Sequence, residues 1–151
     1  VRRVALAQRR PYMKPVPEPS PETRFFWEKC RQHQLWLPYC PRCQRFFWYP
    51  RDFCPRCFTW NVEWRQASGR GKLYSFAIHY RAFHPAWEPE VPYVTAIVEL
   101  EEGVRLYSAL VDVEPDPQKL RCDMPVEVVF EDVDERISLP KFRPLPEDAH
   151  A

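Results

Sequence analysis

The sequence predicts a mainly β protein, with an N-terminal helix and a rubredoxin-like zinc ribbon followed by a five-stranded OB-fold barrel. Two matched C-x2-C pairs predict the ribbon. Strand-like segments with alternating apolar residues, separated by turn signals, fill most of the chain after residue 60 and predict the barrel. A generic five-stranded antiparallel barrel is the alternative. We expect four segments: a basic, Pro-rich arm at 1–19, the helix and four-cysteine zinc ribbon at 20–60, the barrel at 61–135, and a Pro-rich tail at 136–151.

The N-terminal arm and the helix are distinguished by their hydrophobic pattern. The arm is basic, then rich in proline, and shows no apolar period, which is typical of an extended segment. A helix is expected over about 21–34. Ser20 can cap it, and Pro21 suits the first helical position, where no N–H is needed. Phe26 and Cys30 are four residues apart and therefore share one face.

The ribbon follows as YCPRCQRFFWYPRDFCPRCF. Its pairs are Cys40 with Cys43 and Cys54 with Cys57, separated by ten residues. Two such turns supply four thiolates, which suits one tetrahedral Zn²⁺ per chain. A site with four cysteine ligands has no open position for water or substrate, so its predicted role is structural. The remaining cysteines, Cys30 and Cys122, are expected to be buried thiols.

Three consecutive aromatic residues, Phe47, Trp48 and Tyr49, lie between the cysteine pairs. A ribbon of this size cannot cover all three, so they either pack on the helix and barrel or mark a surface for a partner. The two interpretations are about equally supported. The arginines around them indicate nucleic-acid binding as a third interpretation.

The barrel strands are read from alternation, with turn signals at SGRG and EEGV. One face is expected to carry Tyr74, Phe76, Ile78 and Tyr80, and another Val94, Ala96, Val98 and Leu100. A long connection is expected at about 81–92, and DPQKL suggests one short helical turn. The predicted strands are 62–67, 72–80, 93–100, 104–113 and 125–132.

Charge and motifs narrow the function. Residues 62–135 carry seven Lys/Arg against fifteen Asp/Glu, a balance of −8, which disfavours a surface that follows a phosphate backbone. A single-stranded nucleic-acid-binding module thus ranks second and is the alternative function. His79 and His84 lack a recognisable catalytic setting and favour structural roles. With no signal-peptide pattern or long apolar run, we expect a soluble, cytoplasmic chain without a membrane partner.

Several stretches together resemble the zinc-ribbon plus OB-fold family known as domain of unknown function 35. They include PETRFFWEKCRQHQL, the two C-x2-C turns, which we call the knuckles, WRQASGRGKLYSFAIHY and VPYVTAIVELEEGVRLYSALVDV. The resemblance extends over about residues 21–144. Two departures from the family pattern stand out. Gln44 and Phe58 occupy the positions after each cysteine pair where glycine is usual, and the usual I-G-M-P-V is replaced by C-D-M-P-V at residues 122–126.

The resemblance implies a non-catalytic subunit that assembles with a thiolase-fold enzyme acting on acyl-CoA thioesters, by thiolysis or by retro-aldol chemistry. It implies a hetero-oligomer, expected to hold two copies of each chain, and possible fusion to or association with a hot-dog-fold hydratase. The ribbon aromatics and the barrel edge are then candidates for docking the partner. Candidate contacts for the CoA phosphates are Arg51, Arg70 and Lys72.

Overall fold

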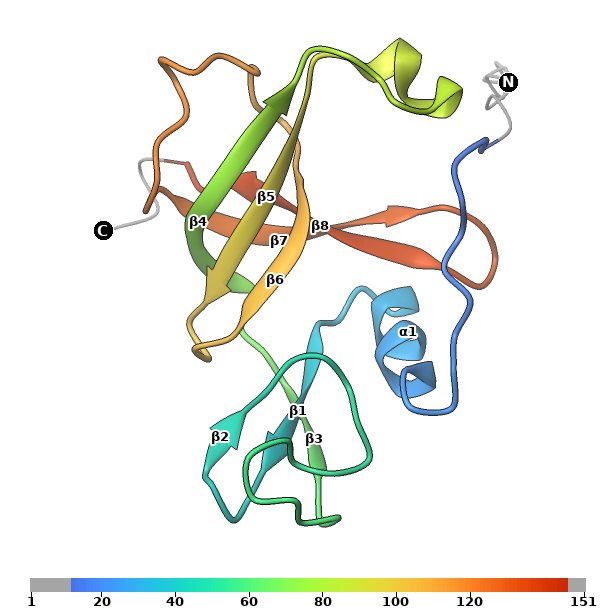
Figure 1. Cartoon of the computed structure of the whole chain (residues 1–151), viewed down its shortest axis with the longest axis vertical. Helices are drawn as coiled ribbons and strands as arrows, with labels where there is room; N and C mark the ends of the chain where they lie inside the picture. Colours follow the sequence, from blue (N-terminus) through green and yellow to red (C-terminus); the bar gives the residue numbers. More distant parts are fainter. Residues whose placement is uncertain (1–11, 147–151) are drawn as a thin grey trace, which may run out of the picture.

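The computed structural model describes residues 12–146, which form a β-barrel, a small ribbon and one helix between them (Figure 1). The basic residues before Tyr12 and the last five residues of the predicted tail lie outside this part. The ribbon is a three-stranded antiparallel sheet in the order β2-β1-β3. Its strands are β1 (Trp36–Cys40), β2 (Arg45–Phe46) and β3 (Glu63–Gln66).

The barrel is closed by five strands in the order β4-β5-β6-β8-β7, which confirms the predicted OB-like architecture. All of its pairings are antiparallel except that of β6 with β8, where the strands run parallel. The strands are β4 (Arg70–His79), β5 (Tyr93–Leu100), β6 (Arg105–Leu110), β7 (Pro125–Asp132) and β8 (Ser138–Pro144), with a 3-10 helix, η1 (Pro85–Glu90), between β4 and β5.

Two strand assignments differ from the sequence-based prediction. The segment 62–67, expected to open the barrel, instead pairs with β1 and completes the ribbon sheet. The fifth barrel strand is β8, which falls in the segment 136–151 predicted as a tail. The prolines Pro140 and Pro144 suggested an irregular tail, yet proline is tolerated in a strand where its missing N–H is not needed for pairing.

In the first barrel strand, β4, the buried face differs from the predicted one. A β-bulge lies between Leu73 and Ser75, and it reverses the inward and outward alternation. Leu73 is fully buried, whereas Tyr74, predicted to share a face with Phe76, is exposed beneath the guanidinium of Arg105. On β5, by contrast, the whole predicted face is buried, from Val94 through Leu100.

Helix α1 (Arg24–Arg31) is shorter than predicted and is preceded by a turn. Phe26 and Cys30 are its buried residues, as their spacing predicted. Its C-terminal end is held to the β7–β8 hairpin, where His33 Nε2 lies 2.8 Å from Asp132 Oδ1 and Arg31 donates to the Glu135 carbonyl. Hydrogen bonds from Ser138 and His33 hold the pKa of Asp132 below its ordinary value.

The helix, the ribbon and the barrel share one hydrophobic core. Phe26 and Cys30 of the helix, together with Leu35 and Leu37 at the start of the ribbon, belong to the same buried cluster as barrel residues such as Phe142. The ribbon is therefore fixed against the barrel by packing. Burial raises the pKa of Cys30 to about 12, whereas Cys122 is exposed, against the prediction that both thiols are buried.

Candidate metal centre and the adjoining pocket

The ribbon brings its four predicted ligands together. Cys40 ends β1, Cys43 lies in the turn before β2, and the second pair lies in the loop from β2 to β3. All four Sγ atoms lie within 4.8 Å of one another. The Sγ atoms of Cys40 and Cys57 are 3.6 Å apart, and those of Cys43 and Cys54 are 4.0 Å apart. Tetrahedral zinc with bonds of about 2.3 Å requires sulfurs about 3.8 Å apart, so these residues fit such an ion.

The surroundings of the sulfurs also suit a cation. The backbone N–H of Cys43 donates to Cys40 Sγ, and that of Arg56 donates to Cys54 Sγ. Burial would raise the pKa of Cys54, but backbone hydrogen bonds from Cys57 and Arg56 lower it to about 7. Hydrogen bonding to Cys57 raises the pKa of Cys43 to about 12. Four clustered sulfur atoms that accept backbone N–H groups suit a bound cation, because a metal is held by cysteine thiolates.

Each knuckle ends in a residue with left-handed backbone conformation. Gln44 has φ 52° and Phe58 has φ 59°, and these are the two positions where the family pattern has glycine. A side chain there costs about 1–2 kcal/mol relative to the right-handed region. Both turns therefore adopt a conformation that glycine takes most easily, with a larger side chain in its place.

Replacing Gln44 by glycine should stabilise the folded chain. The relief of about 1–2 kcal/mol exceeds the entropic cost of glycine, about 0.5–1 kcal/mol, so we expect a gain of roughly 0.5–1 kcal/mol in the free energy of unfolding. Urea denaturation of the metal-loaded chain measures it. Gln66→Gly is the matched control, because that exposed residue lies in β3 and should destabilise. Equal losses in both variants would refute the argument.

The three ribbon aromatics have different environments. Phe47 is buried in the small ribbon core beside Cys40 and Cys54. Trp48 is half-buried and packs edge-on against Phe26, with ring centroids 4.9 Å apart. Tyr49 remains 62% exposed. Of the three, Tyr49 is thus the ring most accessible to a partner.

Sequence reasoning missed a second aromatic group at the far end of the ribbon. Phe53 lies 5.4 Å from Trp60 and 6.3 Å from Phe58, measured between ring centroids. Phe58 is 68% exposed and Trp60 is 73% exposed. We call Phe53, Phe58 and Trp60 the tip cluster. Their position beside the second cysteine pair was visible in the sequence, but their joint exposure depends on the ribbon fold.

The other candidates are dispersed or already engaged. Arg51 lies in the ribbon loop, whereas Arg70 and Lys72 lie on β4, and Lys72 pairs with Glu99 at 3.4 Å and with Asp123 at 3.7 Å. The two histidines have structural partners. The Nε2 atom of His79 lies 2.8 Å from the hydroxyl of Thr95, and its ring stacks on Tyr93. The Nδ1 atom of His84 accepts the N–H of Ala86 and caps η1.

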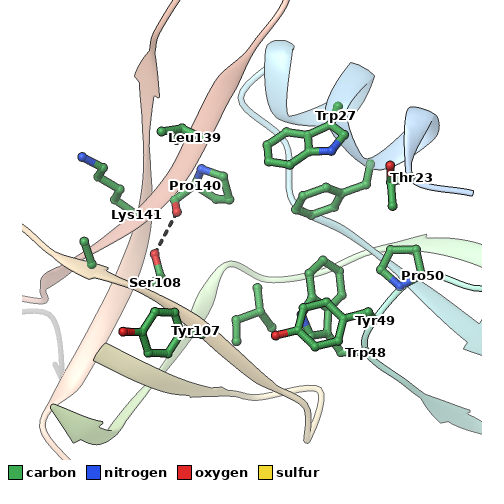
Figure 2. A pocket seen from close by; sticks show the side chains of 13 residues that line it. Thr23, Trp27, Trp48, Tyr49, Pro50, Tyr107, Ser108, Leu139, Pro140 and Lys141 are labelled. Carbon is green, nitrogen blue, oxygen red and sulfur yellow. Dashed lines mark hydrogen bonds between the residues drawn. The ribbon is translucent and has the colours of Figure 1, made fainter. Parts of the chain in front are cut away.

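A pocket of about 400 Å³ lies where the ribbon, helix α1 and the barrel meet (Figure 2). Its walls come from four segments that are far apart in the sequence, and they are mostly apolar. The lining residues are Thr23, Phe26 and Trp27 of the helix region, residues 48–50 of the ribbon, residues 106–109 of β6 and residues 139–141 of β8. The sequence gives no local signal for this pocket, because it exists only through the packing of separate elements.

Comparison with known families matches most of the chain to two models. One is described as the rubredoxin-like zinc ribbon domain of ChsH2, over residues 27–63, and the other as the C-terminal OB-fold domain of ChsH2, over residues 64–131. Among solved structures, the chain resembles one titled "Ltp2-ChsH2(DUF35) aldolase", with a TM-score of 0.75 and 34% identity, covering 85% of this chain and 98% of that one.

Three curated relatives are subunits of enzymes named for CoA thioesters. A probable enoyl-CoA hydratase alpha subunit of Thermomonospora curvata is 35% identical over 87% of this chain. A 3-oxo-4,17-pregnadiene-20-carboxyl-CoA hydratase alpha subunit of Mycobacterium tuberculosis is 33% identical over 77% of it. The benzoylsuccinyl-CoA thiolase subunit BbsA of Thauera aromatica is 32% identical over 70% of it. The match spans 40%, 36% and 73% of these relatives, respectively.

Proposed function

Because this chain belongs to the ChsH2 family of zinc-ribbon and OB-fold proteins, also called DUF35, we propose that it is the accessory subunit of a thiolase-fold enzyme acting on CoA thioesters. The observation that carries the proposal is the likeness to the DUF35 chain of an aldolase, which extends over nearly all of that chain. The reaction of the complex would be thiolysis or retro-aldol cleavage, or the reverse, with the catalytic residues on the partner. Where such a chain is fused, a hot-dog-fold hydratase is the expected neighbour.

In this proposal the metal is one structural zinc ion per chain, held by Cys40, Cys43, Cys54 and Cys57. Four sulfur ligands leave no position for a substrate, so the ion fixes the ribbon and takes no part in the reaction. The ribbon in turn presents aromatic side chains outward. It thereby supplies a rigid surface on which a partner can dock.

The exposed aromatics support the docking role. Tyr49 and the tip cluster, with Phe58 and Trp60, leave large apolar rings in water at a cost of roughly 25 cal/mol per Å². Burying such rings is the usual source of binding energy at the centre of an interface. Arg51, Arg70 and Lys72 would meet the phosphates of a CoA held by the complex.

Purification of the untagged chain from its host tests the proposal. We expect a thiolase-fold protein to co-purify in equal amount, in a complex that contains two copies of each chain. Mass spectrometry identifies the partner, and light scattering gives the stoichiometry. A chain that elutes alone, or that carries single-stranded nucleic acid through physiological salt, would refute the proposal.

No membrane attachment is needed for this role. Among residues 12–146, no helix has the length and apolar character required to cross a bilayer.

A further inference from the structure

The pocket between the ribbon, helix α1 and the barrel lies along an unpaired strand edge. Strand β6 pairs with β8 at a single position, Leu110 with Phe142, so within the described chain the edge of β6 from Arg105 to Ala109 is not paired residue by residue with the neighbouring strand β8. Pro140 of β8 has no N–H to offer there, and its carbonyl accepts a hydrogen bond of 2.8 Å from the Ser108 hydroxyl. The strands therefore diverge and leave a space between them.

Aromatic rings from other elements line this space. Phe26 and Trp27 contribute from helix α1, with ring centroids 5.1 Å apart, and Trp48 packs against Phe26 from the ribbon. Tyr49 of the ribbon and Tyr107 of β6 are each more than 60% exposed and mark the opening. The core fixes the inner rings and the metal knuckles fix the ribbon loop, so the pocket is preformed.

The pocket offers no charge to a ligand. Of the side chains that line it, only Lys141 is charged, and its ammonium is paired with Glu131. Figure 2 shows this side chain pointing away from the aromatic rings. The other lining side chains are apolar or carry neutral polar groups, namely hydroxyls and indole N–H groups, and the Ser108 hydroxyl already donates to the Pro140 carbonyl. The phosphates of CoA would therefore find no partner here, whereas a neutral apolar group loses nothing on entry.

We propose that this pocket binds the ring-bearing apolar part of the acyl group, a flat alicyclic or aromatic ring system, of the CoA thioester on which the complex acts. The inference rests on the proposed function. A volume of about 400 Å³ lies within the range of roughly 300–1,000 Å³ that is usual for small-molecule sites. Planar rings stack well on aromatic walls. Two relatives are named for thioesters that carry rings, a pregnadiene carboxyl and a benzoylsuccinyl group.

The test uses the chain alone, without a partner. Androst-4-ene-3,17-dione, a neutral four-ring ketone, is titrated while tryptophan fluorescence is recorded, because Trp27 and Trp48 line the pocket. We expect saturable quenching. Decanamide, an open chain, and free CoA serve as the comparison probes and should bind at least about tenfold more weakly.

Two alanines provide a matched pair of variants. Ala77 of β4 and Ala109 of β6 are the two register partners of Thr95 on its neighbouring strands, but only Ala109 lines this pocket. Ala109→Phe should fill the space and weaken steroid binding at least about tenfold, whereas Ala77→Phe should leave it within about twofold. If the melting temperature shows that Ala109→Phe has not folded, Tyr49→Ala removes a wall at an exposed position and should weaken binding in the same direction.

The outcomes separate this inference from the proposed function. Absence of saturable steroid binding, equal binding by the Ala77 and Ala109 variants, or equally tight decanamide binding would overturn the inference. A chain that fails in this way yet still assembles with a thiolase-fold protein leaves the proposed function intact. A chain that binds the steroid as expected but assembles with no such protein supports the pocket and overturns the proposed function.

Discussion

Cys54→Ser should release the metal and unfold the ribbon. Apparent zinc binding in sites with four cysteine ligands contributes about 10–16 kcal/mol to folding, which is as large as the whole stability of a typical domain, about 5–15 kcal/mol. The loss should extend beyond the ribbon, because Trp48 packs on Phe26 and both belong to the core shared with the barrel. Urea denaturation should show a broad early transition in place of one cooperative step.

Metal content is measured on the same samples. The native chain should hold one zinc ion and no visible absorption band of the kind that ferric thiolate gives. Cys122→Ser is the control, because this exposed cysteine lies outside the cluster, and both its zinc content and its unfolding curve should match the native chain. Stoichiometric iron, or Cys54→Ser with an unchanged curve, would be incompatible with a structural zinc site.

The ribbon and the metal cluster were predictable because their signal is local. Two cysteines in a C-x2-C turn are held close by a few backbone bonds, and no distant contact is needed to bring them together. The buried face of β5 was predictable for the same reason, since a regular strand alternates strictly.

Features that depend on distant contacts were not predictable. Whether residues 63–66 pair with β1 or open the barrel is decided by packing, since their alternation suits either sheet. The bulge that turns Tyr74 outward leaves no mark on the residue pattern. Strand β8 was not predicted, because Pro140 and Pro144 indicated an irregular tail. The pocket could not be predicted, because its lining comes from four segments, the first and last of which are more than a hundred residues apart in the sequence.

Catalytic activity should require both chains. We expect neither this chain nor its thiolase-fold partner alone to turn over a CoA thioester, and their mixture to restore turnover. Within the complex, Trp60→Ser should weaken assembly by about 2 kcal/mol or more, because aromatic rings buried at the centre of an interface contribute that much. At 73% exposure, Trp60 can be changed with little effect on the isolated fold.

Phe83→Ser is the matched control for the docking surface. Phe83 is 86% exposed and belongs to the connection from β4 to β5. Figure 1 shows this connection at the end of the barrel opposite the ribbon. Each substitution removes one exposed aromatic ring. A difference in the dissociation constant therefore reflects where the ring lies on the surface, and not non-specific hydrophobic association. If the ribbon carries the interface, Trp60→Ser weakens assembly, zinc content stays unchanged, and Phe83→Ser assembles like the native chain. Turnover by this chain alone, or a larger effect from Phe83, would contradict an accessory subunit that docks through its ribbon.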